Sequence, residues 1–187
     1  MTILGEFLKF KDEAAVIGRL SAGYAILEID LMHCAHVVRG DLDTVLKAMF
    51  RARGEKQRIE VADAFGRQHY QNLGLGNEFA TAIGAMHHCR QIRNQYAHCI
   101  WWDDLSGRLA LANLEQIAQQ NALVADLHGL VPYHVDVPHL RAQEEYFDYT
   151  DELLAYVNFE GRHRAGKLPI QDRVLPAQRP QPPLHIP

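Results

Sequence analysis

The stretch HHCRQIRNQYAHCIWW, His87–Trp102, joins the end of one predicted helix to the start of a predicted β-hairpin. Apolar residues recur here at alternating steps of three and four, which is typical of a helix face packed on a core. This pattern predicts a helix over residues 78–99, and we interpret both of its cysteines as packing residues. The residues of this core-facing seam are Ala82, Ala85, Cys89, Ile92, Tyr96 and Cys99.

The opposite arc of the same predicted helix changes from apolar to cationic along its length. The sequence has no acidic residue between Glu78 and Asp103, whereas a solvated helix face would more often mix Glu with Lys. We therefore expect a second contact face, either a groove or a dimer interface, with Ala97 inside it. A two-fold interface would bring a second copy of each polar residue to the same place. The polar half of this arc contains His87, Arg90, Arg93, Asn94 and His98.

The fold class expected from the whole sequence is mainly α. We predict a bundle of about five helices, with a small β-hairpin after the fourth helix and a Pro-rich C-terminal tail. CIWWDD and RLALANLE flank a turn at Ser106 and Gly107, which indicates a hairpin at about residues 99–115. YHVDV, residues 133–137, is interpreted as a further short strand, and residues 116–129 receive no definite element. The other predicted helices cover residues 12–39, 43–53, 55–70 and 138–160.

The chain length of 187 residues suits one domain, which we assign to residues 1–164. Six of the eight prolines lie between Pro169 and Pro187, so residues 165–187 are predicted to form an extended tail. The tail has few large apolar residues, mainly Leu175, Leu184 and Ile186. Because so little apolar surface could be buried there, we expect the tail to be dispensable for folding.

Composition excludes several classes of protein. Hydrophobic residues make up 48% of the chain, which is enough for a full core. The net charge of −4 argues against a broad, non-specific nucleic-acid coat. No apolar run approaches the roughly 20 residues of a membrane span, and the N-terminus lacks a signal-peptide pattern, so we expect a cytoplasmic protein without membrane contact. Three cysteines without a CxxC pair favour neither a disulfide framework nor a cysteine zinc site.

The polar face carries the pattern R-N-x-x-A-H, from Arg93 through Asn94 and Ala97 to His98. On an all-helical domain, near the end of the penultimate long helix, this pattern resembles the HEPN superfamily, many of whose members are ribonucleases. The resemblance covers residues 12–160. The family motif is an Arg followed after four to six residues by a His, often with a polar residue directly after the Arg. In catalytic members two chains dimerise, and their motifs form one shared, metal-independent site.

The resemblance implies a candidate endoribonuclease or RNA-binding domain of the toxin or defence type, acting without a cofactor as a homodimer. His98 would perform acid–base chemistry, since histidine titrates near neutral pH. Arg93 would bind a phosphate oxygen, and Asn94 would orient the imidazole or the substrate. The expected product is a 2′,3′-cyclic phosphate, and a neutralising protein partner is also expected. The predicted RNA-binding residues are His87 and Arg90, with Lys47, Arg51 and Arg53 guiding the RNA backbone.

A structural interpretation of the same motif stays open. Arg93 would then pair with an acid of the first long helix, Glu28 or Asp30, and His98 would stabilise the C-terminus of its helix. The protein would be a non-catalytic helical dimerisation or interaction module that keeps the motif for its structure.

Two other features have alternatives of their own. The basic residues between Lys47 and Arg58 also suit a solvated helix face. His33 and His36 lie three residues apart on a predicted helix, so a metal-binding site that includes both is a further alternative.

Overall fold

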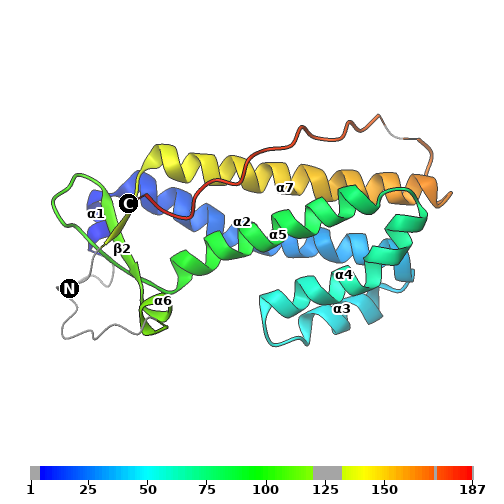
Figure 1. Cartoon of the computed structure of the whole chain (residues 1–187), viewed down its shortest axis with the longest axis horizontal. Coiled ribbons are helices and arrows are strands. Elements are labelled where there is room, and N and C mark those ends of the chain that lie inside the picture. The colour runs from blue at the N-terminus through cyan, green and yellow to red at the C-terminus, as the bar shows by residue number, and fades with distance from the viewer. Residues whose placement is uncertain (1–4, 120–131, 171, 187) are drawn as a thin grey trace. The chain divides into compact units, whose positions relative to one another are not determined.

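The computed structural model describes residues 5–119, 132–170 and 172–186 (Figure 1). These residues form seven helices and one three-stranded antiparallel sheet, which confirms the mainly α fold and the small hairpin. None of the described helices is long and apolar enough to cross a membrane. The helices are α1 (Glu6–Lys9), α2 (Lys11–Arg39), α3 (Leu42–Phe50), α4 (Glu55–Asn72), α5 (Gly76–Ala97), α6 (Leu114–Ala118) and α7 (Val137–Arg164).

The five predicted helices correspond to α2, α3, α4, α5 and α7, with ends shifted by a few residues. The break between α2 and α3 forms where the sequence places it. Gly40 has a φ of +68°, a conformation that glycine adopts without strain. The side chain of Asp41 then accepts a hydrogen bond from the backbone N–H of Thr44, at 3.3 Å, and caps α3. The short helices α1 and α6 were not predicted from the sequence.

The sheet has the strand order β1 (Cys99–Trp102), β2 (Leu109–Asn113) and β3 (Tyr133–Val135). Trp102 pairs with Ala110 at the closed end of the hairpin, and the connection contains two residues with positive φ, Leu105 and Gly107. The central strand β2 is almost wholly buried, whereas β1 is half-buried along its length. The predicted strand at 133–137 is confirmed as β3. Residues 120–129, within the stretch that received no definite element, lie outside the described residues.

The end of α5 differs from the sequence prediction. The helix stops at Ala97, not at residue 99, because Cys99 pairs with Asn113 as the first residue of β1. Cys99 is therefore a strand residue, and its interpretation as the last member of a helical seam was wrong. His98 lies in the turn between helix and strand. The direction of its side chain relative to that of Arg93 therefore cannot be derived from helical geometry. The other five seam residues are all buried: Ala82, Ala85, Cys89, Ile92 and Tyr96.

The chain forms two compact units. Unit 1 contains Met1–Ala22, Gln91–Glu145 and Pro182–Pro187, and unit 2 contains Gly23–Arg90 and Tyr146–Gln181. The boundary falls inside the three long helices α2, α5 and α7.

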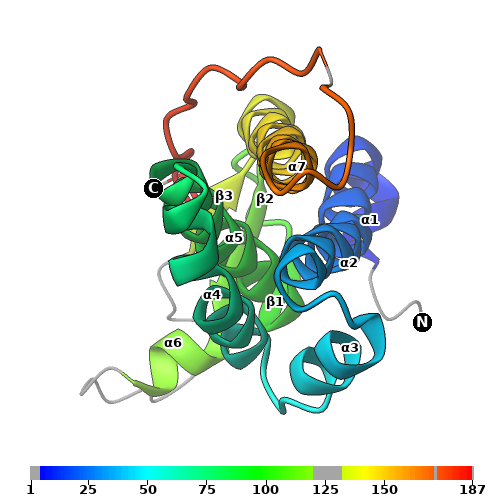
Figure 2. The same ribbon diagram turned by 90° about the vertical axis from the view of Figure 1, so that its right-hand side faces the viewer.

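Unit 1 is built on the three-stranded sheet and the helix segments that pack with it, and Figure 2 shows β2 and β3 next to each other. Its core contains Ile92, Tyr96, Leu109, Leu111 and Val135, each at most 5% exposed. Ile186, near the C-terminus, forms an antiparallel bridge with His134 of β3. The end of the Pro-rich tail is thus part of this unit.

Unit 2 includes α3 and α4, which pack against each other (Figure 1). In its core the rings of Tyr70 and Phe79 stack with centroids 4.5 Å apart. Gly66 makes room for this stack, since a Cβ atom at that position would lie 2.3 Å from Cζ of Phe79. The hydroxyl of Tyr70 donates a hydrogen bond to the carbonyl oxygen of Cys34, at 2.9 Å. Figure 1 shows the tail running along α7 in this unit.

Candidate functional site

Arg93, Asn94 and His98 all lie in unit 1, at the C-terminal end of α5 and directly after it. Arg93 and Asn94 are half-buried on the last turns of the helix. Nη1 of Arg93 donates a hydrogen bond to Oδ1 of Asn94, at 3.0 Å. Asn94 therefore contacts the guanidinium of Arg93, while its predicted role of orienting the imidazole or the substrate stays a prediction.

His98 is exposed to solvent, with 44% of its side chain accessible. Its Nδ1 atom lies 3.4 Å from Oε1 of Glu115 in α6. This contact is an ion pair when the imidazole is protonated. A carboxylate at one ring nitrogen orients the imidazole and leaves the other nitrogen for proton transfer.

Glu115 is a site residue that the sequence analysis missed. It lies in the first turn of α6, a helix of only five residues. The signal available in the sequence was local, because the side chain of Asn113 caps this helix by accepting a hydrogen bond from Gln116 N, at 3.1 Å. This cap fixes the start of α6 directly after β2. Because Asn113 pairs with Cys99, the Glu115 carboxylate lies near the first residue of β1.

The two acids that the structural interpretation assigned to Arg93 have neighbours inside unit 2. Both carboxylate oxygens of Glu28 accept from Nη1 of Arg58, at 3.1 and 2.9 Å. Asp30 lies against Asp151, and burial together with that second carboxyl raises the pKa of Asp30 to about 7. His98 follows the last residue of α5, the position that the same interpretation gives it.

The predicted RNA-binding residues belong to unit 2 and do not share the compact unit of the motif. Lys47 of α3 forms an i,i+4 ion pair with Asp43, at 2.6 Å, which is typical of a solvated helix face. Arg51 and Arg53 follow α3 and are exposed. The structure therefore brings Arg93, Asn94 and His98 into one unit and leaves the basic stretch in the other.

His87 and Arg90 lie one turn apart on the unit 2 part of α5. Burial lowers the pKa of His87, and the nearby charge of Arg90 lowers it further. Both effects favour the neutral form of His87. The Nε atom of Arg90 is buried without a hydrogen-bond partner among the described residues.

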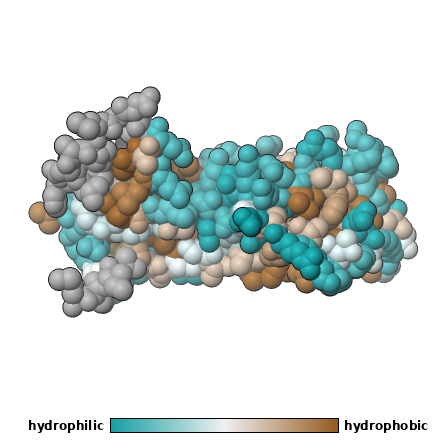
Figure 3. All heavy atoms as spheres, turned by 90° about the horizontal axis from the view of Figure 1, so that it is seen from below, coloured by the Kyte–Doolittle hydropathy of each residue, from teal (hydrophilic) through white to brown (hydrophobic). Residues whose placement is uncertain are grey.

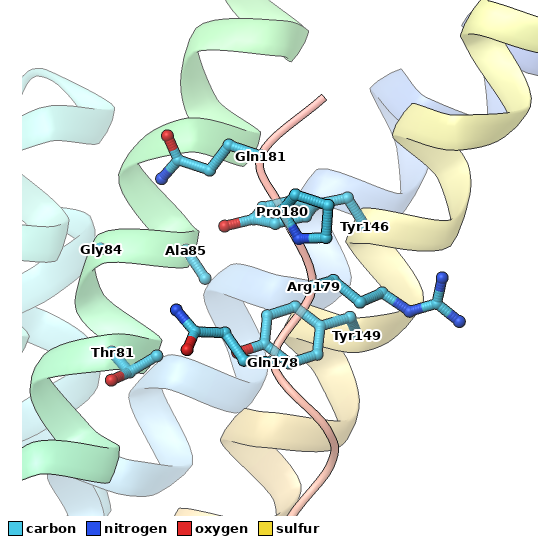
Figure 4. A pocket seen from close by; sticks show the side chains of 9 residues that line it. All are labelled: Thr81, Gly84, Ala85, Tyr146, Tyr149, Gln178, Arg179, Pro180 and Gln181. Carbon is cyan, nitrogen blue, oxygen red and sulfur yellow. The ribbon is translucent and has the colours of Figure 1, made fainter. Parts of the chain in front are cut away.

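A pocket of about 300 Å³ lies in unit 2 between α5, α7 and the tail (Figure 4). Figure 4 shows the tail crossing the space between the two helices, with the Arg179 side chain extending over α7. The small side chains of α5 leave the space, and two tyrosines of α7 form its opposite wall. The lining residues are Thr81, Gly84, Ala85, Tyr146, Tyr149, Gln178, Arg179, Pro180 and Gln181.

A second cluster that the sequence analysis missed lies in unit 1, around the C-terminal residues. Nε2 of Gln143 donates to the carbonyl oxygens of Pro183 and Leu184, at 2.9 and 3.0 Å. Nε2 of Gln95 also donates to the Leu184 oxygen, at 2.6 Å, and Nε2 of His139 lies 3.2 Å from it. The cluster has no acidic or metal-binding pattern, and its targets are backbone atoms, so no motif in the sequence marks it.

The described residues contain no group of three or more His, Cys, Asp or Glu side chains that could hold a metal ion. His33 and His36 accordingly have no third ligand within the described part of the chain. Figure 3 shows a largely hydrophilic face interrupted by apolar areas. The large exposed apolar side chains in unit 2 include Ile26 and Ile29 of α2, and Leu42, Leu46 and Phe50 of α3.

Comparison with known proteins found no matching family model, no matching curated protein and no matching solved structure.

Proposed function

We propose that this protein is a metal-independent endoribonuclease of the toxin or defence type, whose site is shared between two copies of the chain. The observation that carries the proposal is the pairing of an exposed His98 with the carboxylate of Glu115, at 3.4 Å. An imidazole that is both oriented and accessible is what general acid–base catalysis requires. The half-buried Arg93 in the same unit supplies the cationic donor.

The reaction proposed is transesterification within RNA. A base removes the proton from a 2′-hydroxyl, and the 2′-oxygen forms a new bond to the adjacent phosphorus. The bond from phosphorus to the 5′-oxygen breaks, and an acid donates a proton to that leaving oxygen. The products are a 2′,3′-cyclic phosphate and a 5′-hydroxyl end. One His98 cannot be base and acid at the same moment, so a second copy provides the other imidazole.

Arg93 would stabilise the additional negative charge on the non-bridging oxygens of the five-coordinate phosphorus. The hydrogen bond from Arg93 to Asn94 holds the guanidinium in one orientation, which lowers the entropy lost when phosphate binds. Ala97 is exposed between these residues, and its small side chain would allow a second α5 to approach closely. A two-fold axis near Ala97 would place both copies of the motif around one phosphate.

A second candidate is a non-catalytic dimerisation module. The hydrogen bond between Arg93 and Asn94 favours it, because a guanidinium held by a side chain of its own chain also fits a structural role. In this case the same face would form a dimer without cleaving RNA.

Incubation of purified protein with a mixture of RNAs in the presence of EDTA tests the proposal. We expect fragments with 2′,3′-cyclic phosphate and 5′-hydroxyl ends. The variant Ala97→Arg should be monomeric by light scattering and inactive, while Ala177→Arg, at an exposed alanine of the tail, should keep both properties. A dimer that leaves every RNA intact would support the non-catalytic module, and cleavage that EDTA abolishes would exclude the proposed mechanism.

A further inference from the structure

We infer that unit 1 contains a binding site for a peptide segment, that residues 183–186 occupy it within one chain, and that the same segment of a second copy is its alternative occupant. The site consists of Gln95, His139 and Gln143 together with the outer edge of β3. It shares no residue with Arg93, Asn94 and His98, and it does not depend on ribonuclease activity.

The first argument is that the site binds main-chain atoms. Gln143 donates to two consecutive carbonyl oxygens, those of Pro183 and Leu184, at 2.9 and 3.0 Å. Gln95 donates to the second of them, at 2.6 Å. Leu184 lies at a bend of the chain, which lets one amide reach both oxygens, and contacts to main-chain atoms are independent of the side chains of the bound segment.

The second argument is burial. With the segment in place, Gln143 is 0% exposed and Gln95 is 6% exposed, so the segment helps to shield both amides from water. Removing the segment would take away these hydrogen bonds, which contribute to stability. The hydroxyl of Tyr96 donates to Oε1 of Gln143 and thereby points the NH₂ group at the peptide. The Gln143 amide is therefore already oriented for a bound segment.

The third argument is the sheet edge. β3 is an outer strand, and its unpaired backbone groups are a template for another strand. Ile186 takes this position, because its N–H donates to the oxygen of His134 at 2.9 Å and its oxygen accepts from His134 N at 2.8 Å. The ring of His185 stacks on Tyr133 with centroids 3.5 Å apart. Strand addition of this kind is a common mode of peptide recognition.

The occupant is identified by the chain itself. Every copy carries both the site and a segment that fits it, and reciprocal exchange between two copies closes with two-fold symmetry. The segment is attached through a run that is almost wholly exposed, residues 172–181, in which Val174 is 87% exposed. An exposed connection of this kind can redirect the segment without unfolding a core.

The peptide-binding arm uses the full chain and a fluorescein-labelled peptide with the sequence of residues 178–186. The variant Ile186→Pro removes the N–H that bonds to His134 and so releases the chain's own segment. An attached segment competes at an effective concentration in the millimolar range, so we expect the peptide to bind this variant about tenfold more tightly than the unmodified chain. Val174→Pro, at an exposed position, should bind like the unmodified chain.

Two controls make this arm specific. A labelled peptide with proline in place of Ile186 should not bind, because it lacks the donor to β3. Adding Gln143→Met or, separately, Gln95→Met to the Ile186→Pro chain should weaken binding at least about tenfold if circular dichroism shows the fold retained. A folded Ile186→Pro chain that binds the intact peptide no better than the unmodified chain overturns the site.

The exchange arm mixes two differently tagged full-length chains at high concentration and captures one tag. Co-capture should persist for Ala97→Arg, which removes the proposed α5 interface and is expected to be monomeric only at the lower concentration of the light-scattering test. It should be lost when Ile186→Pro is added to Ala97→Arg. Loss of co-capture from Ala97→Arg alone would show that copies associate only through α5, and co-capture by the double variant would show an association that does not use the segment. Either result overturns the second copy as occupant and leaves the ribonuclease proposal to its own test. Absence of co-capture even from the unmodified chain would overturn this occupant and would also contradict the two-copy site of the ribonuclease proposal.

Discussion

Nδ1 of His98 faces Oε1 of Glu115 at 3.4 Å, across the junction where α5 ends and β1 begins. The carboxylate is itself 67% exposed, so the pair lies on the surface and is not buried in the core. Two consequences follow. Changes at either residue should leave stability almost untouched, and any effect on RNA cleavage would then report chemistry.

His98→Ala removes the proposed proton carrier. General acid–base catalysis typically contributes about 10²- to 10⁴-fold to a rate, so cleavage should fall by that factor. Glu115→Gln removes the charge that orients the imidazole and should give a smaller loss. Thermal melting of the same preparations should shift by no more than a degree or two. Unchanged cleavage by His98→Ala would exclude this residue from catalysis.

Arg93→Ala separates the catalytic and the structural interpretations of the motif. If Arg93 stabilises the transition state, cleavage should fall by about 10²- to 10³-fold while the protein stays folded. If Arg93 is part of a buried ion pair, the variant should lose about 3–5 kcal/mol of unfolding free energy. Chemical denaturation and RNA cleavage measured side by side distinguish these results, and Arg93→Lys adds a control that keeps the charge without the planar donor.

Deletion of residues 182–187 should destabilise unit 1. The chain would lose the hydrogen bonds of Gln143 and Gln95 to the segment, and an ordinary hydrogen bond contributes about 0.5–1.5 kcal/mol to stability. The midpoint of urea unfolding should fall accordingly, whereas Val174→Ser, in the exposed part of the tail, should leave it unchanged. An equally stable shortened chain would support the sequence-based expectation that the tail is dispensable.

Much of the helical fold follows from the sequence because its determinants are local. The apolar seam from Ala82 to Tyr96 predicts the buried face of α5, and the gap between the helices predicted at 12–39 and 43–53 matches the break before α3. The end of α5 depends on a pairing with Asn113, which is distant in sequence, so helical periodicity continues past the true end. Glu115 belongs to a helix too short for a periodic pattern.

The role of the C-terminal segment could not be read from hydropathy. The expectation that the tail is dispensable counted only its apolar side chains, of which there are few. The segment is held instead through its backbone, by the amides of Gln95 and Gln143 and by the N–H and carbonyl of His134. Backbone acceptors are the same in every sequence, so no residue pattern identifies them.

Gly66→Ala should destabilise unit 2. The new Cβ atom would lie 2.3 Å from Cζ of Phe79, a ring that is itself stacked on Tyr70, so neither ring can move freely. Overpacking of this kind typically costs about 1–3 kcal/mol. Gly84→Ala in α5 is the matched control, since its Cβ would meet no atom within 4 Å. That variant should gain about 0.5–1 kcal/mol from helix propensity, as measured by urea unfolding.

The pair of Asp30 and Asp151 should make stability depend on pH. Burial, together with Asp151, raises the pKa of Asp30 to about 7, compared with about 3.9 in an unfolded chain. Stability from this group is therefore complete below about pH 4 and declines as the pH rises to about 7.

Asp30→Asn should remove this decline, so that unfolding free energies at pH 5 and pH 8 differ less than in the unmodified chain. Asp172→Asn, at an exposed position, should preserve the original pH dependence. If Asp30→Asn and Asp172→Asn show the same pH dependence of the unfolding free energy, titration of Asp30 does not cause the decline in stability.

The three cysteines give the molecule internal reporters of opening. Cys34 and Cys89 are 0% exposed in unit 2, Cys99 is half-buried in unit 1, and burial raises the pKa of each thiol to about 12. Alkylation requires a thiolate in contact with solvent, so each thiol reacts chiefly during the moments when its surroundings open. The labelling rates, measured for each cysteine by mass spectrometry of peptides, would therefore report how often each unit opens in the native protein without any denaturant. Equal rates at Cys89 and Cys99 would mean that α5 of unit 2 and β1 of unit 1 open in a single event, and unequal rates would mean that one of them opens alone.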